Sequence, residues 1–178
     1  MALSIIGVND QVKSEIASNL WDEAGQGNIQ RFHTTLFIKL MNSMGLTYQR
    51  NQIIQNMIWE GIAGINLFSY LSFYPFNKMK YFGLLAATEM LDPSHYHKLI
   101  QGINRIVDDK KIDISYYTEH ETIDVVHADG WLRKVVIPEL DKRPAMTREF
   151  WLGFYMRLNS AKQYYDQLLN VFATQKAA

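Results

Sequence analysis

The sequence contains no cysteine and little proline, and both shortages restrict what the protein can be. Without cysteine there are no disulfides, no thiolate nucleophile, and no zinc fingers or iron–sulfur clusters. Any bound metal ion must therefore be held by histidine, aspartate and glutamate. Only four prolines occur in 178 residues, so long segments remain free of helix breakers.

The sequence also lacks an excess of charge and a long apolar run. It has 18 basic and 18 acidic residues, so no overall field attracts nucleic acid or an anionic membrane, and we expect neither as a partner. The first residues lack the basic flank and apolar core of a secretory signal, and no apolar run is long enough to span a membrane. We therefore expect a cytoplasmic protein with a single domain over residues 1–178.

Between the prolines, apolar residues recur with helical spacing, which predicts an all-α protein. Segment 52–73 is apolar nearly all round, which is typical of a helix in the middle of a bundle. Pro75 and Pro93 are expected to end helices. With short connections, a helical bundle is the expected architecture. The predicted helices cover about 10–23, 28–44, 52–73, 77–91, 94–107, 114–137 and 147–173.

The most specific local pattern is His120-x-x-x-Asp124-x-x-His127. At about 100° per helical residue, these side chains project within roughly 60° of one another and share a face. Neighbouring Ile123 and Val126 indicate that part of this helix is buried, where unpartnered polar groups are costly. Two imidazoles and a carboxylate also suit ferrous iron and leave coordination positions open. The alternative is a solvated helix face with two surface histidines.

Other polar residues stand in apolar surroundings. Glu89 is the one charged residue between Phe82 and Leu91, so it is either a metal ligand or the paired end of a core hydrogen bond, and we favour the ligand. Glu60 is a reserve candidate of the same kind, and His33 lies either in the core or along its border.

These residues together resemble the haem-oxygenase-like non-haem diiron oxidases and oxygenases, also described as iron-containing redox enzymes. The resemblance covers roughly 19–131. Without this resemblance, Asp22 and Glu23 would be interpreted only as the exposed acidic end of a helix. The matching motifs are Trp21-Asp22-Glu23-x-Gly25-x-Gly27 leading to His33, Gly83 to Glu89 ending near Pro93, and His120-x-x-x-Asp124-x-x-His127. The resemblance implies a haem-oxygenase-like bundle of about seven helices, with metal ligands Glu23, His33, Glu89, His120, Asp124 and His127.

The resemblance further implies one or two Fe(II) ions, dioxygen as co-substrate, and oxidation of a small organic molecule such as an amino acid or fatty acid. Relatives usually carry another carboxylate well upstream of the position of Glu23, whereas only 22 residues precede it here. Glu15 or Asp10 would have to substitute, unless the chain is a natural short version, a fragment, or completed by a partner.

Three alternatives stay open. Thiaminase-II-like or pyrroloquinoline-quinone-synthase-like enzymes share this architecture without metal, but the thiaminase-like chemistry relies on a cysteine that is missing here. A true haem oxygenase would leave the histidine and carboxylate set without a purpose. The third alternative is a non-catalytic helical interaction module, which could be a homodimer and in which the histidines are incidental.

Overall fold

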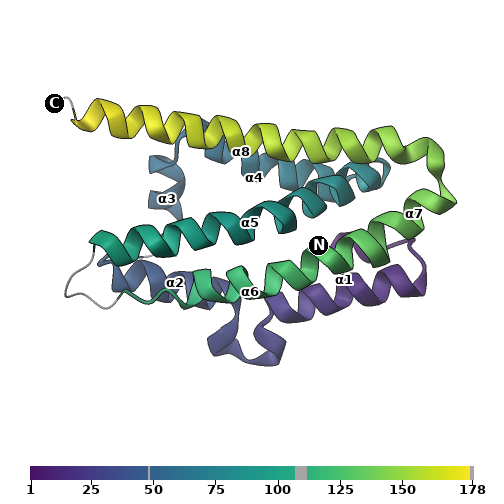
Figure 1. Ribbon diagram of the computed structural model, residues 1–178, viewed down its shortest axis with the longest axis horizontal. Helices are drawn as coiled ribbons and strands as arrows, with labels where there is room; N and C mark the ends of the chain where they lie inside the picture. Colours follow the sequence, from purple (N-terminus) through teal and green to yellow (C-terminus); the bar gives the residue numbers. More distant parts are fainter. Residues whose placement is uncertain (48, 107–111, 177–178) are drawn as a thin grey trace. The chain divides into compact units, whose positions relative to one another are not determined.

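The computed structural model describes residues 1–47, 49–106 and 112–176, and within these ranges the regular elements are helices (Figure 1). Two compact units are formed, one by Met1–Tyr48 with Thr88–Lys142 and the other by Gln49–Ala87 with Arg143–Ala178. None of the helices in the described ranges combines the length and apolar character needed to cross a bilayer. The α-helices are α1 (Asp10–Glu23), α2 (His33–Ser43), α3 (Arg50–Asn56), α4 (Trp59–Phe73), α5 (Lys78–Ile106), α6 (Ser115–Gly130), α7 (Ile137–Lys142) and α8 (Thr147–Lys176).

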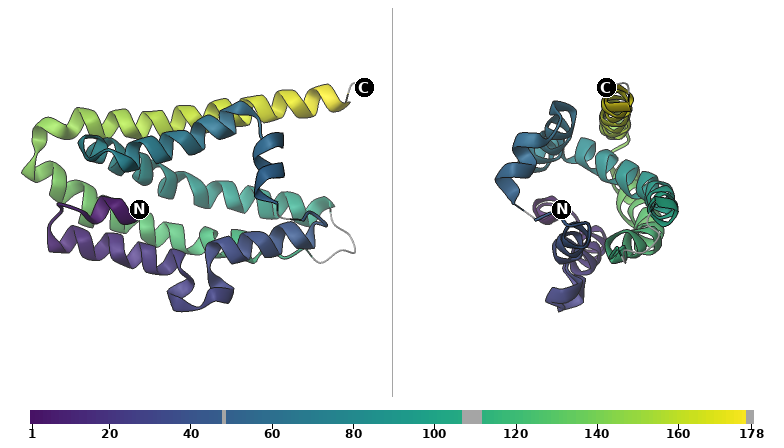
Figure 2. Two further views of the ribbon diagram at one scale, coloured as in Figure 1. Left: turned by 180° about the vertical axis from the view of Figure 1, so that it is seen from behind. Right: turned by 90° about the vertical axis from the view of Figure 1, so that its left-hand side faces the viewer.

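In the first unit, α1 has the bounds that the sequence predicts. Asn9 caps its start, because the side-chain oxygen accepts a hydrogen bond from the Val12 backbone N–H at 2.9 Å. Val12 and Ile16, one turn apart, are fully buried. The helix ends where the backbone turns left-handed, at η2 (Gly25–Gly27). Figure 2 shows η2 and η3 (Ile29–Arg31) projecting from the join between α1 and α2.

The predicted helix over 28–44 therefore begins later than expected, at His33, because η3 occupies its first turn. The helix predicted over 114–137 is also modified. After α6, the chain continues as a π-helical segment, η5 (Trp131–Val136), and then as α7, which includes Pro138. The π-helical segment packs against α1, where the Lys134 ammonium lies 2.9 Å from the Glu15 carboxylate.

Pro93 does not end a helix as predicted, because α5 runs through it and joins the two segments expected over 77–91 and 94–107. Residue 107 itself lies outside the described part. Proline removes one backbone hydrogen bond, and burial of the first half of the helix offsets that loss. Every residue from Tyr81 to Ala87 is buried, so this segment, and not 52–73, is the helix that is apolar and covered on all sides.

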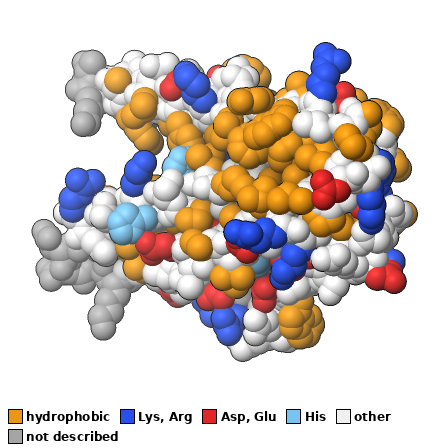
Figure 3. Space-filling view, turned by 45° about the vertical axis from the view of Figure 1, so that its right-hand side comes forward, with side chains coloured by type: hydrophobic (Ala, Val, Ile, Leu, Met, Phe, Trp, Pro, Cys, Tyr) orange, Lys and Arg blue, Asp and Glu red, His pale blue; other side chains and the backbone are white. Residues whose placement is uncertain are grey.

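The single buried helix predicted over 52–73 is wrong in two respects. Met57 and Ile58 are extended and separate α3 from α4, and neither residue is a proline or glycine that would have predicted the break. Leu71 is the buried residue of α4, whereas Trp59 and Phe73 are each 67% exposed. A broad area of hydrophobic side chains is visible on the face drawn in Figure 3. Apolar character alone did not indicate burial.

Candidate metal centre

The structure gathers the six predicted ligands into two groups of three, both within the first unit. Within each group, one ligand atom from every residue lies within 4.8 Å of the others. The first group, which we call triad 1, is Glu23, His33 and His120. The second, triad 2, is Glu89, Asp124 and His127.

Helix α6 contributes to both triads. His120, Asp124 and His127 are 7%, 3% and 2% exposed, so the alternative of a solvated histidine face is wrong. The positions at i, i+4 and i+7 share a face, but they are spread along the helix axis by about 1.5 Å per residue. His120 therefore meets the ends of α1 and α2, and Asp124 with His127 meets Glu89 on α5.

In triad 1, Nδ1 of His33 lies 2.8 Å from Oε2 of Glu23, but the contact is not an aligned hydrogen bond. The imidazole rings of His33 and His120 lie 4.3 Å apart. Nδ1 of His120 donates to the carbonyl oxygen of Tyr116 at 2.7 Å, since a carbonyl can only accept. This contact leaves Nε2 of His120 as the nitrogen with a free lone pair.

In triad 2, His127 is surrounded by carboxylates. Its Nδ1 lies 3.5 Å from Oε2 of Glu89 and 3.9 Å from Oδ1 of Asp124, without an aligned hydrogen bond. On the other side of the ring, Nε2 lies 3.2 Å from Oδ2 of Asp22. Nδ1 is therefore buried, close to two carboxylates and without a hydrogen-bond partner.

The charges of the metal-free centre reflect this crowding. Burial, followed by the nearby Glu89, raises the pKa of Asp124 to about 8. Burial lowers the pKa of His127, but the contacts with Glu89 and Asp22 outweigh it and raise this pKa to about 9. In triad 1 the directions are opposite, since burial lowers the pKa of His120. Burial of Glu23 raises its pKa, but the neighbouring imidazoles lower it overall.

The residues fit a cation in each triad. Nδ1 of His33 and Nδ1 of His127 are buried nitrogens without hydrogen-bond partners, and each faces a carboxylate of its own triad. Leaving buried polar groups unpaired costs about 1–3 kcal/mol each, and coordination of a shared cation removes that cost. The donor set of imidazole and carboxylate suits a divalent first-row metal such as ferrous iron.

A cleft of about 320 Å³ opens beside triad 1. All three residues of triad 1 line it, so an ion held there would face the cleft. The cleft also has an aromatic side, on which the rings of Phe37 and Tyr116 meet edge to face at 5.2 Å. The remaining lining residues are Thr34 and Ile38. This arrangement offers a small molecule access to triad 1.

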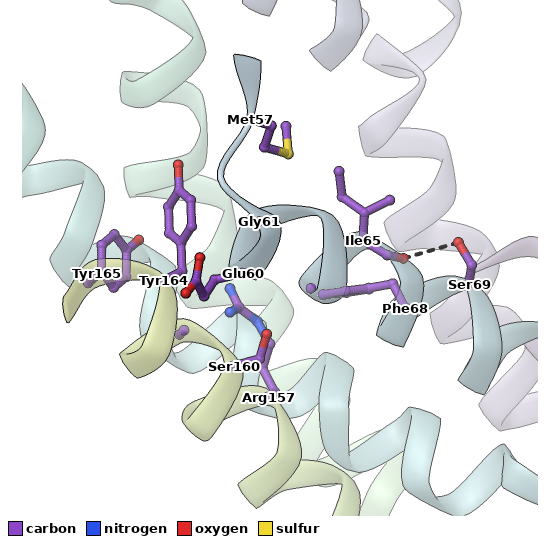
Figure 4. Close-up of a pocket in the computed structure, with 12 residues that line it drawn as sticks. Met57, Glu60, Gly61, Ile65, Phe68, Ser69, Arg157, Ser160, Tyr164 and Tyr165 are labelled. Atoms are coloured by element: carbon purple, nitrogen blue, oxygen red, sulfur yellow. Dashed lines mark hydrogen bonds between the residues drawn. The ribbon is translucent and has the colours of Figure 1, made fainter. Parts of the chain in front are cut away.

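The other carboxylates that the sequence offered belong to neither triad. Glu15 pairs with Lys134, and Asp10 pairs with Lys13 at 3.3 Å, so neither substitutes for the upstream carboxylate. The reserve candidate Glu60 lines a cavity of about 440 Å³ in the second unit, between α4 and α8 (Figure 4). There its Oε2 is buried without a hydrogen-bond partner, and Arg157 of α8 points toward the same space.

Sequence reasoning missed Asp22 as part of the centre. The resemblance implies Glu23 as a ligand and gives Asp22 no role, but adjacent helical residues point about 100° apart and can face different groups. Glu23 therefore faces His33 of triad 1, whereas Asp22 faces His127 of triad 2. No spacing rule along the chain indicates this division, because it depends on where the end of α1 meets α6.

Fold and site together define a helical protein with two compact groups of histidine and carboxylate side chains, of which triad 2 is fully buried and triad 1 is buried except for Glu23. Residues 1–162 match the family described as iron-containing redox enzymes, and the chain belongs to that family. This membership confirms the predicted all-α, haem-oxygenase-like fold, and the family is one described as redox enzymes.

The chain is also similar to the nitrosourea synthase of Streptomyces achromogenes subsp. streptozoticus, with 26% identity over 138 residues. The similar region covers 78% of this chain and 29% of that protein. The chain thus matches less than a third of the length of its relative.

Proposed function

We propose that this chain binds two ferrous ions, one in each triad, and oxidises a small organic substrate with dioxygen. The observation that carries the proposal is the division of six inward-facing side chains into two compact groups, each with histidine and carboxylate. Three protein ligands leave an iron ion with open positions, as non-haem oxygenases require. Iron bound there would supply the electrons that reduce dioxygen. Membership of an iron-containing redox family supports this interpretation.

The cleft beside triad 1 is the proposed substrate site. Phe37 and Ile38 provide apolar lining, and Thr34 provides a hydroxyl group. Burial raises the pKa of Tyr116 to about 12, so its phenol stays neutral near pH 7. The lining favours a substrate with an apolar portion, consistent with the expected amino acid or fatty acid. The ligands would hold the metal, and the cleft would orient the substrate beside it.

Anaerobic titration with Fe(II) tests the proposal. We expect wild type to bind two ions per chain, and His127→Ala and His33→Ala each to bind one. Asp129→Ala is a matched control on α6, because Asp129 is exposed and pairs with Arg133. Optical spectra after oxygen exposure should show a transient visible band in wild type and a diminished one in both histidine variants. Equal weak binding by all four proteins would rule out the iron centre.

The second candidate is the helical interaction module, which the exposed apolar side chains favour. Trp59, Phe73 and Leu169 of the second unit are each 67% exposed, and large exposed apolar side chains are typical of interaction sites where they form a contiguous patch. The same titration separates the two functions, since an interaction module without a metal centre would bind no iron. Sedimentation at increasing protein concentration would then report whether the chain associates with itself.

A further inference from the structure

Asp22 contacts Nε2 of His127, the ring nitrogen that faces away from Glu89 and Asp124. A neutral imidazole has one N–H and one lone pair, so only one of its nitrogens can coordinate a cation. Nδ1 lies 3.5 Å from the Glu89 carboxylate and has no aligned hydrogen bond. Nε2 points to Asp22 at 3.2 Å. A cation shared with Glu89 therefore requires Nδ1 as the ligand and the proton on Nε2.

We infer that Asp22 is a positioning residue that keeps the proton on Nε2 of His127 and thereby presents Nδ1 to the metal. The inference rests on the proposed function, because it concerns the ion of triad 2. A carboxylate that accepts from the second ring nitrogen fixes the tautomer and the orientation of a ligating histidine. His120 is held in the opposite sense, because its Nδ1 donates to the Tyr116 carbonyl. The two histidines of α6 thus present different nitrogens.

The turn after α1 explains why Asp22 is held in place. Gln26 Nε2 donates to Oδ1 of Asp22 at 2.9 Å, which leaves Oδ2 for His127. Gln26 reaches back because its backbone is left-handed, with φ of 55°, between two glycines that also have positive φ. A side chain on Gly25 would collide with the backbone of Arg31. The Gly25-Gln26-Gly27 turn therefore supports Asp22 as well as connecting α1 to α2.

Cobalt titration tests the inference, with Co(II) as a spectroscopic probe that reports its coordination in the visible range. Glu89→Gln first identifies the absorption of the ion in triad 2. We expect Asp22→Ala to lower the Co(II) affinity of triad 2 by about 10- to 100-fold and to leave the Co(II) affinity of triad 1 unchanged. Asp22→Asn should restore most of the affinity, because an amide oxygen can still accept from Nε2. Asp129→Ala, the exposed control on α6, should bind as wild type does.

A second measurement on wild type avoids any folding defect of the variants. In Zn(II)-loaded protein labelled with ¹⁵N, we expect the His127 ring to show a protonated Nε2 and a metal-bound Nδ1. A metal-bound Nε2 would overturn the inference, and so would an Asp22→Ala variant with wild-type affinity. Equal losses in Asp22→Asn and Asp22→Ala would also contradict the hydrogen-bond role. Failure of wild type to bind any cation would instead refute the proposed function.

Discussion

His127 has the most unusual environment of any side chain in the centre. In the metal-free protein its imidazolium lies between the carboxylates of Asp22 and Glu89 and supplies positive charge to both, and the carboxyl group of Asp124 lies beside it. The raised pKa values, about 9 for His127 and about 8 for Asp124, mean that both hold protons at pH 7. A metal ion must displace these protons before it can bind.

We therefore predict that ion binding to triad 2 releases protons at pH 7 and that its affinity rises as the pH approaches 9. The sign follows because each raised pKa favours the protonated, metal-free form below that value. Triad 1 should release fewer protons, because the pKa values of Glu23 and His120 are lowered. Calorimetric titration with Co(II) in buffers of different ionisation enthalpy measures the number released.

Two variants separate the triads in that experiment. Glu89→Gln confines binding to triad 1 and should give little proton release, whereas His33→Ala confines it to triad 2 and should keep the larger release. Similar proton release in both variants would show that the protonation of triad 2 described above is wrong.

At the scale of the elements, close packing between α5 and α8 depends on glycine. A Cβ on Gly83 would collide with the backbone of Phe150 and Phe154, and one on Gly153 would collide with the Lys80 carbonyl. Near this contact the Lys80 ammonium lies 2.6 Å from the Glu149 carboxylate. The Gly83 stretch, first noted for its resemblance to a family motif, therefore has a packing role within the second unit.

We predict that Gly83→Ala lowers the free energy of unfolding by about 1–3 kcal/mol, the typical cost of overpacking a close contact. Gly102→Ala is the matched control, because the same helix leaves open space around Gly102. It should raise stability by about 0.5–1 kcal/mol through the lower backbone entropy of alanine. Urea denaturation measures both. Equal effects of the two substitutions would contradict the close approach of α5 and α8.

Helix boundaries show which local signals were reliable. The bounds of α1 were predicted correctly, and in the structure a cap at Asn9, a buried apolar stripe and a glycine turn mark its start, its packed face and its end. The break at Met57 and Ile58 has no such local signal in the sequence. Pro93 predicted the end of a helix, but α5 continues through it. A single proline removes one hydrogen bond, and burial of the first half of α5 outweighs that loss.

At the scale of the molecule, both triads lie in the first unit and none of their ligands in the second. An ion in triad 1 would link α1, α2 and α6, and one in triad 2 would link α5 and α6. Because bound ions stabilise the folded form of the segments that hold them, loading should not affect all helices equally.

We predict that Zn(II) loading slows backbone hydrogen exchange most at the end of α1, the start of α2 and throughout α6. Exchange in α4 and α8, which carry no ligand, should change little. Exchange monitored by mass spectrometry with and without Zn(II) measures the difference. In the His127→Ala variant, the slowing of exchange that comes from the ion in triad 2 should be absent. Equal slowing in α8 and α6 would contradict a centre confined to the first unit.

The sequence by itself determined the helical class and the shared face of three candidate ligands on α6, because both depend on local backbone geometry. Glu23 and His33 joined that set only through the resemblance to a known family. A fixed turn of about 100° per residue places His120, Asp124 and His127 on one face wherever that helix lies. Only the tertiary structure decided how these side chains divide into two triads. It also places Asp22 against His127 of triad 2, whereas its neighbour Glu23 belongs to triad 1. The pairing of distant helices depends on packing between segments far apart in the chain, and no local pattern encodes it.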